Sequence, residues 1–446
     1  MKTNEDHATA AGPSVDVAGW IEEFDSGFAC IAGRFGRVEP RKQARAFLLG
    51  LLSDVDSRTC WALAEQAGDV SPQRMQRLLG EAVWDAGKVR DDLRAYVLTT
   101  LGDPQGVLVL DDTGDLKKGT HTVGVQRQYT GTAGRIENAQ VAVFLAYATP
   151  AGRALIDREL YLPRSWTDDP ARCAAAGVPA DVGFATKTVL GRRMLARAFD
   201  AGVQAGWVTA DEGYGGDQAL RKDLQTRGIG YVLAVAKSHH VVLATVGDIR
   251  ADTVVAEHLP SRAWQRLSAG AGAKGERDYD WAWIAILAPA REQPGQHALL
   301  VRRRISDGEL AYYRCFSPQP VTLATLVRVA GIRWMVEECF QAGKGETGLD
   351  QHQVRRWTSW HRYTTLVMLA HAILTAIAVT ARTIHDPTGD LIPLTVNEIR
   401  HLFAKLVLTP IRTAVYWLTW SDWRRRHQAR AKLSHYRRRQ AIDNLA

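Results

Sequence analysis

The chain has 446 residues, of which 46% are hydrophobic and 23% charged, so it can bury a large core and is expected to form two to four domains. Its five cysteines are far apart and form no C-x-x-C pair, which argues against a zinc site and suits a reducing cytoplasm. The net charge is +8, and residues 421–440 alone carry +7. This surplus favours nucleic acid over a membrane as a polyanionic partner.

The N-terminal region has a helical pattern. Residues 1–16 are expected to form a flexible leader without a signal-peptide core, and residues 17–105 a helical DNA-binding domain. Within it, a short helix over 57–67 and a second helix after Ser71-Pro72 have the spacing of a helix-turn-helix. Arg74 and Arg77 on the second helix could then contact DNA. Two helices that only pack in a bundle show the same spacing, so that alternative stays open.

The pattern changes at Gly106. Residues 107–110 form a continuous apolar run, typical of a buried strand, which ends in Asp-Asp-Thr-Gly. Strands and helices then follow in the order of an RNase H-like fold: strands at 120–129, 139–148 and 154–162, a helix at 185–201, a strand at 207–210, a helix at 217–226 and a strand at 231–236. We therefore predict an α/β fold in which residues 106–237 form the first part of a mixed sheet flanked by helices.

A β-rich insertion is predicted at 238–320, before the last helices of the core at 321–384. Its tryptophans, Trp264, Trp281 and Trp283, are either core residues or platforms for a displaced base. One helix is expected over 321–344, followed by an apolar helix at 366–381 that is too short for a membrane span and should be buried. Residues 385–446 should form a linker at 385–389, a helix capped by Thr395 and Glu398, and a basic tail.

Acidic residues on three of these elements could converge. Asp112 and Asp211 follow apolar strands that would be neighbours in the sheet, and Arg333, Glu337 and Lys344 lie within about 40° on one helix stripe. Three close carboxylates repel one another unless cations join them, and oxygen ligands suit Mg²⁺ or Mn²⁺. Two such ions about 4 Å apart support cleavage of a phosphodiester. We therefore predict that Asp112, Asp211 and Glu337 are catalytic metal ligands.

These motifs resemble those of the DDE transposases of bacterial insertion sequences, in the branch with a Y-x2-R-x3-E-x6-K signature. Arg333, Glu337 and Lys344 match the R, E and K, whereas Ala330 stands at the tyrosine position. The first and second aspartate motifs match at residues 111–114 and 210–215, and the family also carries a β-rich insertion. The resemblance covers roughly residues 40–385 and is closest to the subgroup numbered seven hundred and one. The basic tail lies outside it.

The resemblance also implies site assignments. The family has threonine directly after its first aspartate, which favours Asp112 over Asp111, since neighbouring strand residues face opposite sides. Arg333 and Lys344 would then hold DNA phosphates. Basic residues of the hairpin after Asp112 and of the tail either hold phosphates too or are solvated surface charges: Lys117, Lys118, Arg127, Arg424, Arg425 and Arg426.

The function implied is cleavage at the ends of a mobile element, followed by joining of the 3′-hydroxyl to target DNA. Two Mg²⁺ or Mn²⁺ ions are the implied cofactors. The expected partner is double-stranded DNA, both terminal inverted repeats and target, with a homodimer on paired ends, no membrane, and a bacterial cytoplasmic, nucleoid-associated location. Two alternatives remain: a catalytically silent DNA-binding relative, and a metal-dependent nuclease without strand transfer.

Overall fold

The computed structural model describes residues 15–69, 71–272, 275–288, 292–383, 391–408 and 414–443. The predicted linker at 385–389 lies outside these residues, as does the predicted leader except for its last two positions. One of these, Asp16, caps helix α2 (Val17–Ala32) by accepting a hydrogen bond from the Gly19 backbone N–H.

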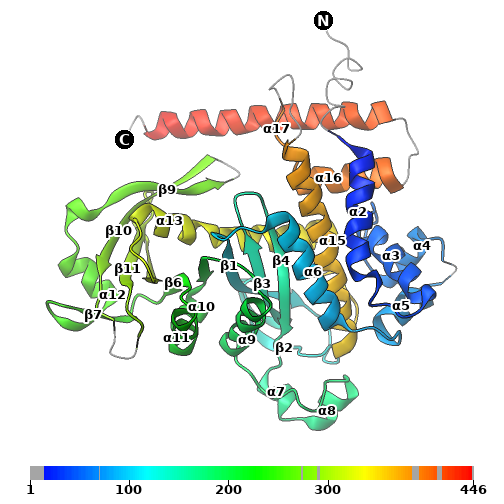
Figure 1. The fold of residues 1–446 in the computed structure, drawn as a ribbon, viewed down its shortest axis with the longest axis horizontal. Helices are drawn as coiled ribbons and strands as arrows, with labels where there is room; N and C mark the ends of the chain where they lie inside the picture. The colour runs from blue at the N-terminus through cyan, green and yellow to red at the C-terminus, as the bar shows by residue number, and fades with distance from the viewer. Residues whose placement is uncertain are drawn as a thin grey trace, which may run out of the picture.

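Five N-terminal helices surround one long apolar helix. They are α2, α3 (Val38–Leu52), α4 (Cys60–Gln66), α5 (Gln73–Gly80) and α6 (Ala86–Leu101). The long helix α15 (Trp357–Thr383) contacts α2, α3, α5 and α6, so the N-terminal helices share a core with the C-terminal part of the chain (Figure 1). The helix is longer than the predicted 366–381, so the expectation that it is too short for a membrane span is wrong. Its predicted burial is confirmed, because 89% of its most apolar window is buried in the protein.

The helix-turn-helix spacing is present at α4 and α5. Met75, Leu78 and Leu79 are buried on α5, whereas Arg74 and Arg77 are three-quarters exposed. This amphipathic placement buries the apolar side against the bundle and leaves the cations in solvent. It suits both a DNA-contacting helix and simple bundle packing.

The central sheet has the predicted mixed topology. Strand β1 (Val107–Leu116) pairs antiparallel with β3 (Arg135–Ala148) and parallel with β5 (Trp207–Ala210), which in turn is parallel to β6 (Gly230–Val235). The long β3 also pairs with β2 (Gln126–Thr130) and β4 (Arg153–Leu160). The parallel strands β1, β5 and β6, together with β3 and its antiparallel partners, form the mixed α/β sheet expected of an RNase H-like fold.

The strands of the predicted insertion extend this same sheet. Strand β12 (Leu310–Ser317) pairs with β6, so β11 (Gln296–Arg303), β10 (Gly275–Ala285) and β9 (Gln265–Gly272) complete a ten-stranded sheet. The insertion interrupts the core in sequence but continues its hydrogen-bonded ladder in space (Figure 1). A separate hairpin, β7 (His240–Leu243) and β8 (Gly247–Arg250), is followed by α12 (Ala251–Thr253), the π-helix η2 (Val254–His258) and the 3-10 turn η3 (Ser261–Ala263).

The sheet is contacted by the helices α9 (Lys187–Asp200), α10 (Glu212–Gly215), α11 (Gln218–Thr226), α13 (Leu323–Ile332) and α14 (Trp334–Thr347). The short helices α7 (Arg164–Thr167) and α8 (Pro170–Ala175) pack against each other below it (Figure 1). The prediction of one unbroken helix over 321–344 is wrong, because α13 and α14 are separate. At Arg333 the helical ladder is replaced by a tighter hydrogen bond from the Val336 N–H to the Arg333 carbonyl, at 3.2 Å.

The C-terminal region is helical. Thr395 caps α16 (Val396–Phe403) by accepting from the Glu398 N–H, as predicted, and Leu394 and Ile399 are buried beside it. The π-helix η4 (Ala404–Leu408) follows. The basic tail belongs to one long helix, α17 (Ala414–Asp443), which runs along one side of the molecule and contacts α16 and β10 (Figure 1).

Candidate active site

The candidate site lies where the parallel pairing of β1 with β5 ends. Strand β5 stops at Ala210, whereas β1 continues to Leu116, so the prediction that the first strand ends before Asp111 is wrong. The register pairs Leu110 of β1 with Ala210 of β5, so the acidic residues that follow both positions share one edge of the sheet. Asp211 directly follows β5 and caps α10, accepting a 2.9 Å hydrogen bond from the Gly213 N–H. The predicted convergence of the first and second aspartate motifs is therefore present in the fold.

The two residues of the first motif face different helices. Asp111 lies 3.7 Å from the Arg333 guanidinium at the start of α14. Asp112 accepts a 2.9 Å hydrogen bond from Lys187 Nζ and lies 3.5 Å from the Tyr214 hydroxyl, so it faces α9 and α10. This is the alternation expected along a strand.

The carboxylates at this edge raise one another's pKa. Burial raises the pKa of Asp111 to about 7, and the charge of Asp211 adds to the rise while Arg333 opposes it. Burial also raises the pKa of Asp211, with Asp112 as the next cause. These mutually repelling oxygen donors fit a hard divalent cation, which would relieve the repulsion. Among the described residues, no three acidic, histidine or cysteine side chains are already gathered as a metal cluster.

The glutamate helix carries its signature residues beside β1. Glu337 is 43% exposed and lies 3.8 Å from Arg333, one turn earlier, so Arg333 stands between Glu337 and Asp111. Lys344 Nζ donates to Thr113 Oγ1 at 2.8 Å and lies 3.2 Å from Thr132 Oγ1. Burial lowers the pKa of Lys344. The structure thus brings Arg333 and Lys344 to the strand that carries Asp112, whereas the printed partner of Glu337 is Arg333 on its own helix.

Two residues at the site were missed by sequence reasoning. Tyr214 belongs to the second aspartate motif, and its contact with Asp112 depends on a turn that no spacing rule specifies. Lys187 is the first residue of α9, 75 positions from Asp112. The available signal was its position, since a cation in the first turn opposes the helix dipole and calls for a nearby anion.

The predicted DNA-contacting residues after Asp112 have different surroundings. Lys117 is paired with Asp115 and donates to the His352 carbonyl at 3.0 Å, so it holds the loop after α14. Lys118 and Arg127 are exposed. Exposure suits a phosphate contact for these two, whereas Lys117 already has protein partners.

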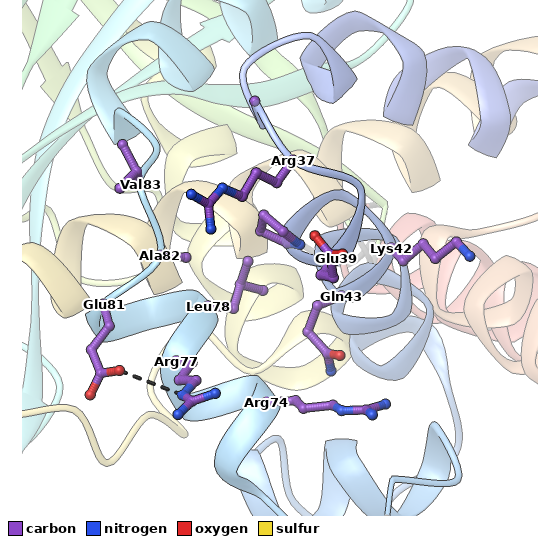
Figure 2. Close-up of a pocket in the computed structure, with 12 residues that line it drawn as sticks. Arg37, Glu39, Lys42, Gln43, Arg74, Arg77, Leu78, Glu81, Ala82 and Val83 are labelled. Atoms are coloured by element: carbon purple, nitrogen blue, oxygen red, sulfur yellow. Dashed lines mark ion pairs between the residues drawn. The ribbon is translucent and has the colours of Figure 1, made fainter.

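A second candidate surface is a groove of about 960 Å³ between α3 and α5. Figure 2 shows Arg37, Lys42, Arg74 and Arg77 around it, with Leu78 in the middle of the view. Arg74 is paired with Asp69 at 3.2 Å, and Arg77 with Glu81 at 3.6 Å. Such exposed pairs are weak, so these cations stay available for a stronger anion.

The predicted cations of the tail are not equivalent. Arg425 is buried and donates to the Ile392 carbonyl at 2.9 Å, which suits packing of α17 and does not suit a phosphate contact. Arg426 pairs with Asp422 one turn earlier. The side chain of Arg424 lies outside the described part of the structure.

A mixed sheet with acidic residues directly after the parallel pairing of two strands, flanked by a helix bearing glutamate and two cations, defines the class of nucleases and polynucleotidyl transferases that cleave phosphodiesters. The profile of the family described as "DDE superfamily endonuclease" matches residues 30–261, more than half of the chain. The profile "Transposase DDE domain" matches residues 185–373. The chain belongs to the DDE family of transposases and endonucleases, as its motifs predicted.

One curated relative is described as "Probable transposase for insertion sequence element IS701", from Microchaete diplosiphon. It is 26% identical over 257 residues, which cover 57% of this chain and 61% of the relative. The match to a solved structure, the NurA nuclease from Sulfolobus solfataricus, covers 56% of this chain and 80% of the nuclease chain, at 8% sequence identity. Its TM-score of 0.26 is too low to support an argument about the fold.

Proposed function

We propose that this protein is a transposase that cuts DNA at the ends of its own mobile element and joins the freed ends to target DNA. The observation that carries the proposal is the pairing of strands β1 and β5, which sets the first and second aspartate motifs side by side next to the signature helix. In the first step water attacks the scissile phosphorus and leaves a 3′-hydroxyl. In the second, that hydroxyl attacks a target phosphodiester.

We propose Asp112, Asp211 and Glu337 as the metal ligands. Asp112 is preferred to Asp111 because threonine follows it and because its side chain is more exposed, 22% against 13%. Two divalent ions, when bound, would activate the attacking oxygen and stabilise the leaving one. Glu337 lies on α14, on the side of β1 that Asp111 faces, so a metal site shared with Asp112 requires α14 to move relative to β1 when metal or DNA binds.

The cations around these carboxylates would orient DNA. Arg333 offers a planar fork that matches a phosphate, and Lys344 places an ammonium next to Thr113. Exposed cations of the hairpin, of the groove between α3 and α5, and of α17 would bind flanking backbone. The proposed partners are the terminal inverted repeats and target DNA, bound by a homodimer on paired ends in the bacterial cytoplasm and nucleoid.

The test is cleavage and strand transfer of labelled element ends by Asp112→Asn, Asp211→Asn and Glu337→Gln, with Asp111→Asn as the matched control. Each of the first three should abolish both reactions while retaining DNA binding. Normal cleavage by any of them would remove that residue from the site. If Asp111→Asn abolishes cleavage and Asp112→Asn does not, the first metal ligand is Asp111 and not Asp112.

The same assay separates the two other functions that the family permits. A silent DNA-binding relative would bind the ends without cutting them in Mg²⁺ or Mn²⁺. A nuclease without transfer would cut the ends but leave no joined product with target DNA. The contacts of Arg333 and Lys344 at the carboxylate edge favour an active enzyme.

A further inference from the structure

Lys187 carries a positive charge at a place where its own helix disfavours one. It is the first residue of α9, whose N-cap, Thr186, accepts from the Val189 N–H. The partial positive charge of a helix N-terminus repels cations in the first turn. Lys187 therefore does not stabilise α9, and the reason for its charge must be sought in the group that it contacts.

That group is Asp112, because Lys187 Nζ lies 2.9 Å from Asp112 Oδ1. Close packing of α9 against β1 holds Lys187 in this position. One turn along the helix, a Cβ added to Gly191 would lie 3.1 Å from Leu110 Cδ1. The ammonium is thus held at the carboxylates that would bind metal, on the face opposite to Arg333.

An ammonium and a divalent ion cannot share this oxygen. Mg²⁺ binds carboxylate oxygens at about 2.0–2.1 Å, so an ion on Asp112 Oδ1 would lie within a few ångströms of the ammonium, where like charges repel strongly. The Lys187 side chain is 34% exposed, so its ammonium can move into solvent without leaving a buried charge. We infer that Lys187 is a positioning residue that takes the place of the cation beside Asp112 in the metal-free protein and withdraws when metal binds.

This inference rests on the proposed function, because it needs Asp112 to be a metal ligand. The alternative is an ordinary ion pair that ties α9 to β1. The two differ in one respect: a placeholder competes with metal, whereas a structural pair stabilises the fold equally with and without metal. Metal affinity and metal-dependent stability therefore distinguish them without any measurement of DNA cleavage.

The test compares the full-length wild type with Lys187→Met, which keeps side-chain length without charge, and Lys187→Arg, which keeps the charge. The matched control is Arg192→Met on the same helix, since Arg192 pairs with Asp223 at 2.8 Å and is similarly exposed, at 31%. Mn²⁺ affinity is measured by titration calorimetry. Lys187→Met should bind about tenfold more tightly than wild type, while Lys187→Arg and Arg192→Met should stay within about threefold.

Thermal melting gives the second readout. In EDTA, Lys187→Met should melt below wild type, because the carboxylates lose their counter-charge, and saturating Mg²⁺ should remove the difference. Arg192→Met should show the same small deficit in both conditions. Folding of Lys187→Met only in the presence of Mg²⁺ would also support the placeholder.

Three results overturn the inference. The first is an Mn²⁺ affinity of Lys187→Met within twofold of wild type. The second is a melting temperature of Lys187→Met that lies equally far below wild type in EDTA and in Mg²⁺. The third is a Lys187→Met protein that is unfolded in both conditions. If wild type itself binds no divalent ion, the metal site of the proposed function fails and the inference falls with it. If wild type binds and Lys187→Met binds equally, only the inference fails.

Discussion

Lys344 reaches from the last turns of α14 to Thr113 of β1, where its ammonium donates a 2.8 Å hydrogen bond to the threonine hydroxyl. The two residues are 231 positions apart in sequence. Thr113 directly follows Asp112, so this contact sets the last cation of the signature one residue from the proposed metal ligand. It also joins the glutamate helix to the strand of the first aspartate.

We expect Lys344→Met to reduce cleavage of a bound DNA end at least tenfold, about 1.4 kcal/mol of transition-state stabilisation, because it removes the charge that we propose to contact a DNA phosphate. Lys344→Arg should be milder. The control Thr113→Val removes only the hydroxyl that holds the ammonium, so it should have the smaller effect. Single-turnover cleavage at saturating Mg²⁺ measures all three, and equal rates for Lys344→Met and wild type would assign Lys344 to packing.

The sequence predicted those elements whose local pattern is self-contained. The strand at 207–210 has its predicted bounds because three apolar residues and a threonine lie between Gly206 and Asp211, and the cap at Thr395 was readable from Glu398 three positions on. The acidic residues after both apolar runs followed from the same reading, although β1 continues past its aspartates to Leu116. Their adjacency followed from the fold class, since β1 and β5 pair in parallel up to Leu110 and Ala210.

What the sequence could not provide were contacts between distant segments. Nothing in the pattern of β12 indicates that it pairs with β6, so the sequence did not predict that the insertion extends the sheet. The break at Arg333 depends on docking of α13, where the Gly331 backbone is so near β9 that an added Cβ would lie 2.0 Å from the Ala269 carbonyl oxygen. The contact of Lys187 with Asp112 likewise depends on how α9 packs.

The exposed cations of α17 should bind DNA backbone without regard to sequence. Replacing Arg430, Lys432 and Arg437 with glutamine leaves the buried Arg425 in place, so α17 should remain docked. Removing one phosphate-binding cation should flatten the log-log salt dependence of binding by close to one unit, for specific and random DNA alike. An unchanged slope in fluorescence-anisotropy titrations over a range of salt would place α17 away from DNA.

Acid should destabilise the protein through its buried histidines. Burial, followed by the charge of Arg153, lowers the pKa of His371 in α15 to about 4. The unfolded chain, with a histidine pKa near 6.5, therefore binds more protons below that pH, and stability falls as pH drops from about 6.5 to 4. His371→Leu should lose less stability than wild type between pH 7 and 4.5, by on the order of 2 kcal/mol.

Urea unfolding at the two pH values measures this difference in metal-free buffer. His239 has its pKa lowered to about 4 by burial as well, so the variant should still lose part of its stability in acid. The quantity compared is therefore the loss in free energy of unfolding between the two pH values, in wild type and in the variant. Parallel loss in wild type and variant would show that His371 does not titrate with unfolding.

Arg333 offers the sharpest test of the signature helix, because two accounts of it predict different costs. It lies 3.7 Å from Asp111 and 3.8 Å from Glu337, so both ion pairs are longer than a hydrogen bond and leave the guanidinium able to bind phosphate. A phosphate clamp should make Arg333→Ala at least tenfold slower in cleavage, about 1.4 kcal/mol. Arg333→Lys should be impaired too, since lysine lacks the planar fork.

The competing account is a surface pair between Arg333 and Glu337 one turn apart, worth only about 0.3 to 0.5 kcal/mol. Cleavage of a pre-bound end at saturating Mg²⁺ distinguishes the two, because binding and metal loading are then complete. Arg328→Ala on α13, which removes an equal charge from an exposed position, is the control and should cleave normally. A rate for Arg333→Ala within twofold of wild type would leave the helix pair as the explanation, since removing a clamp on the scissile phosphate would slow the chemical step itself.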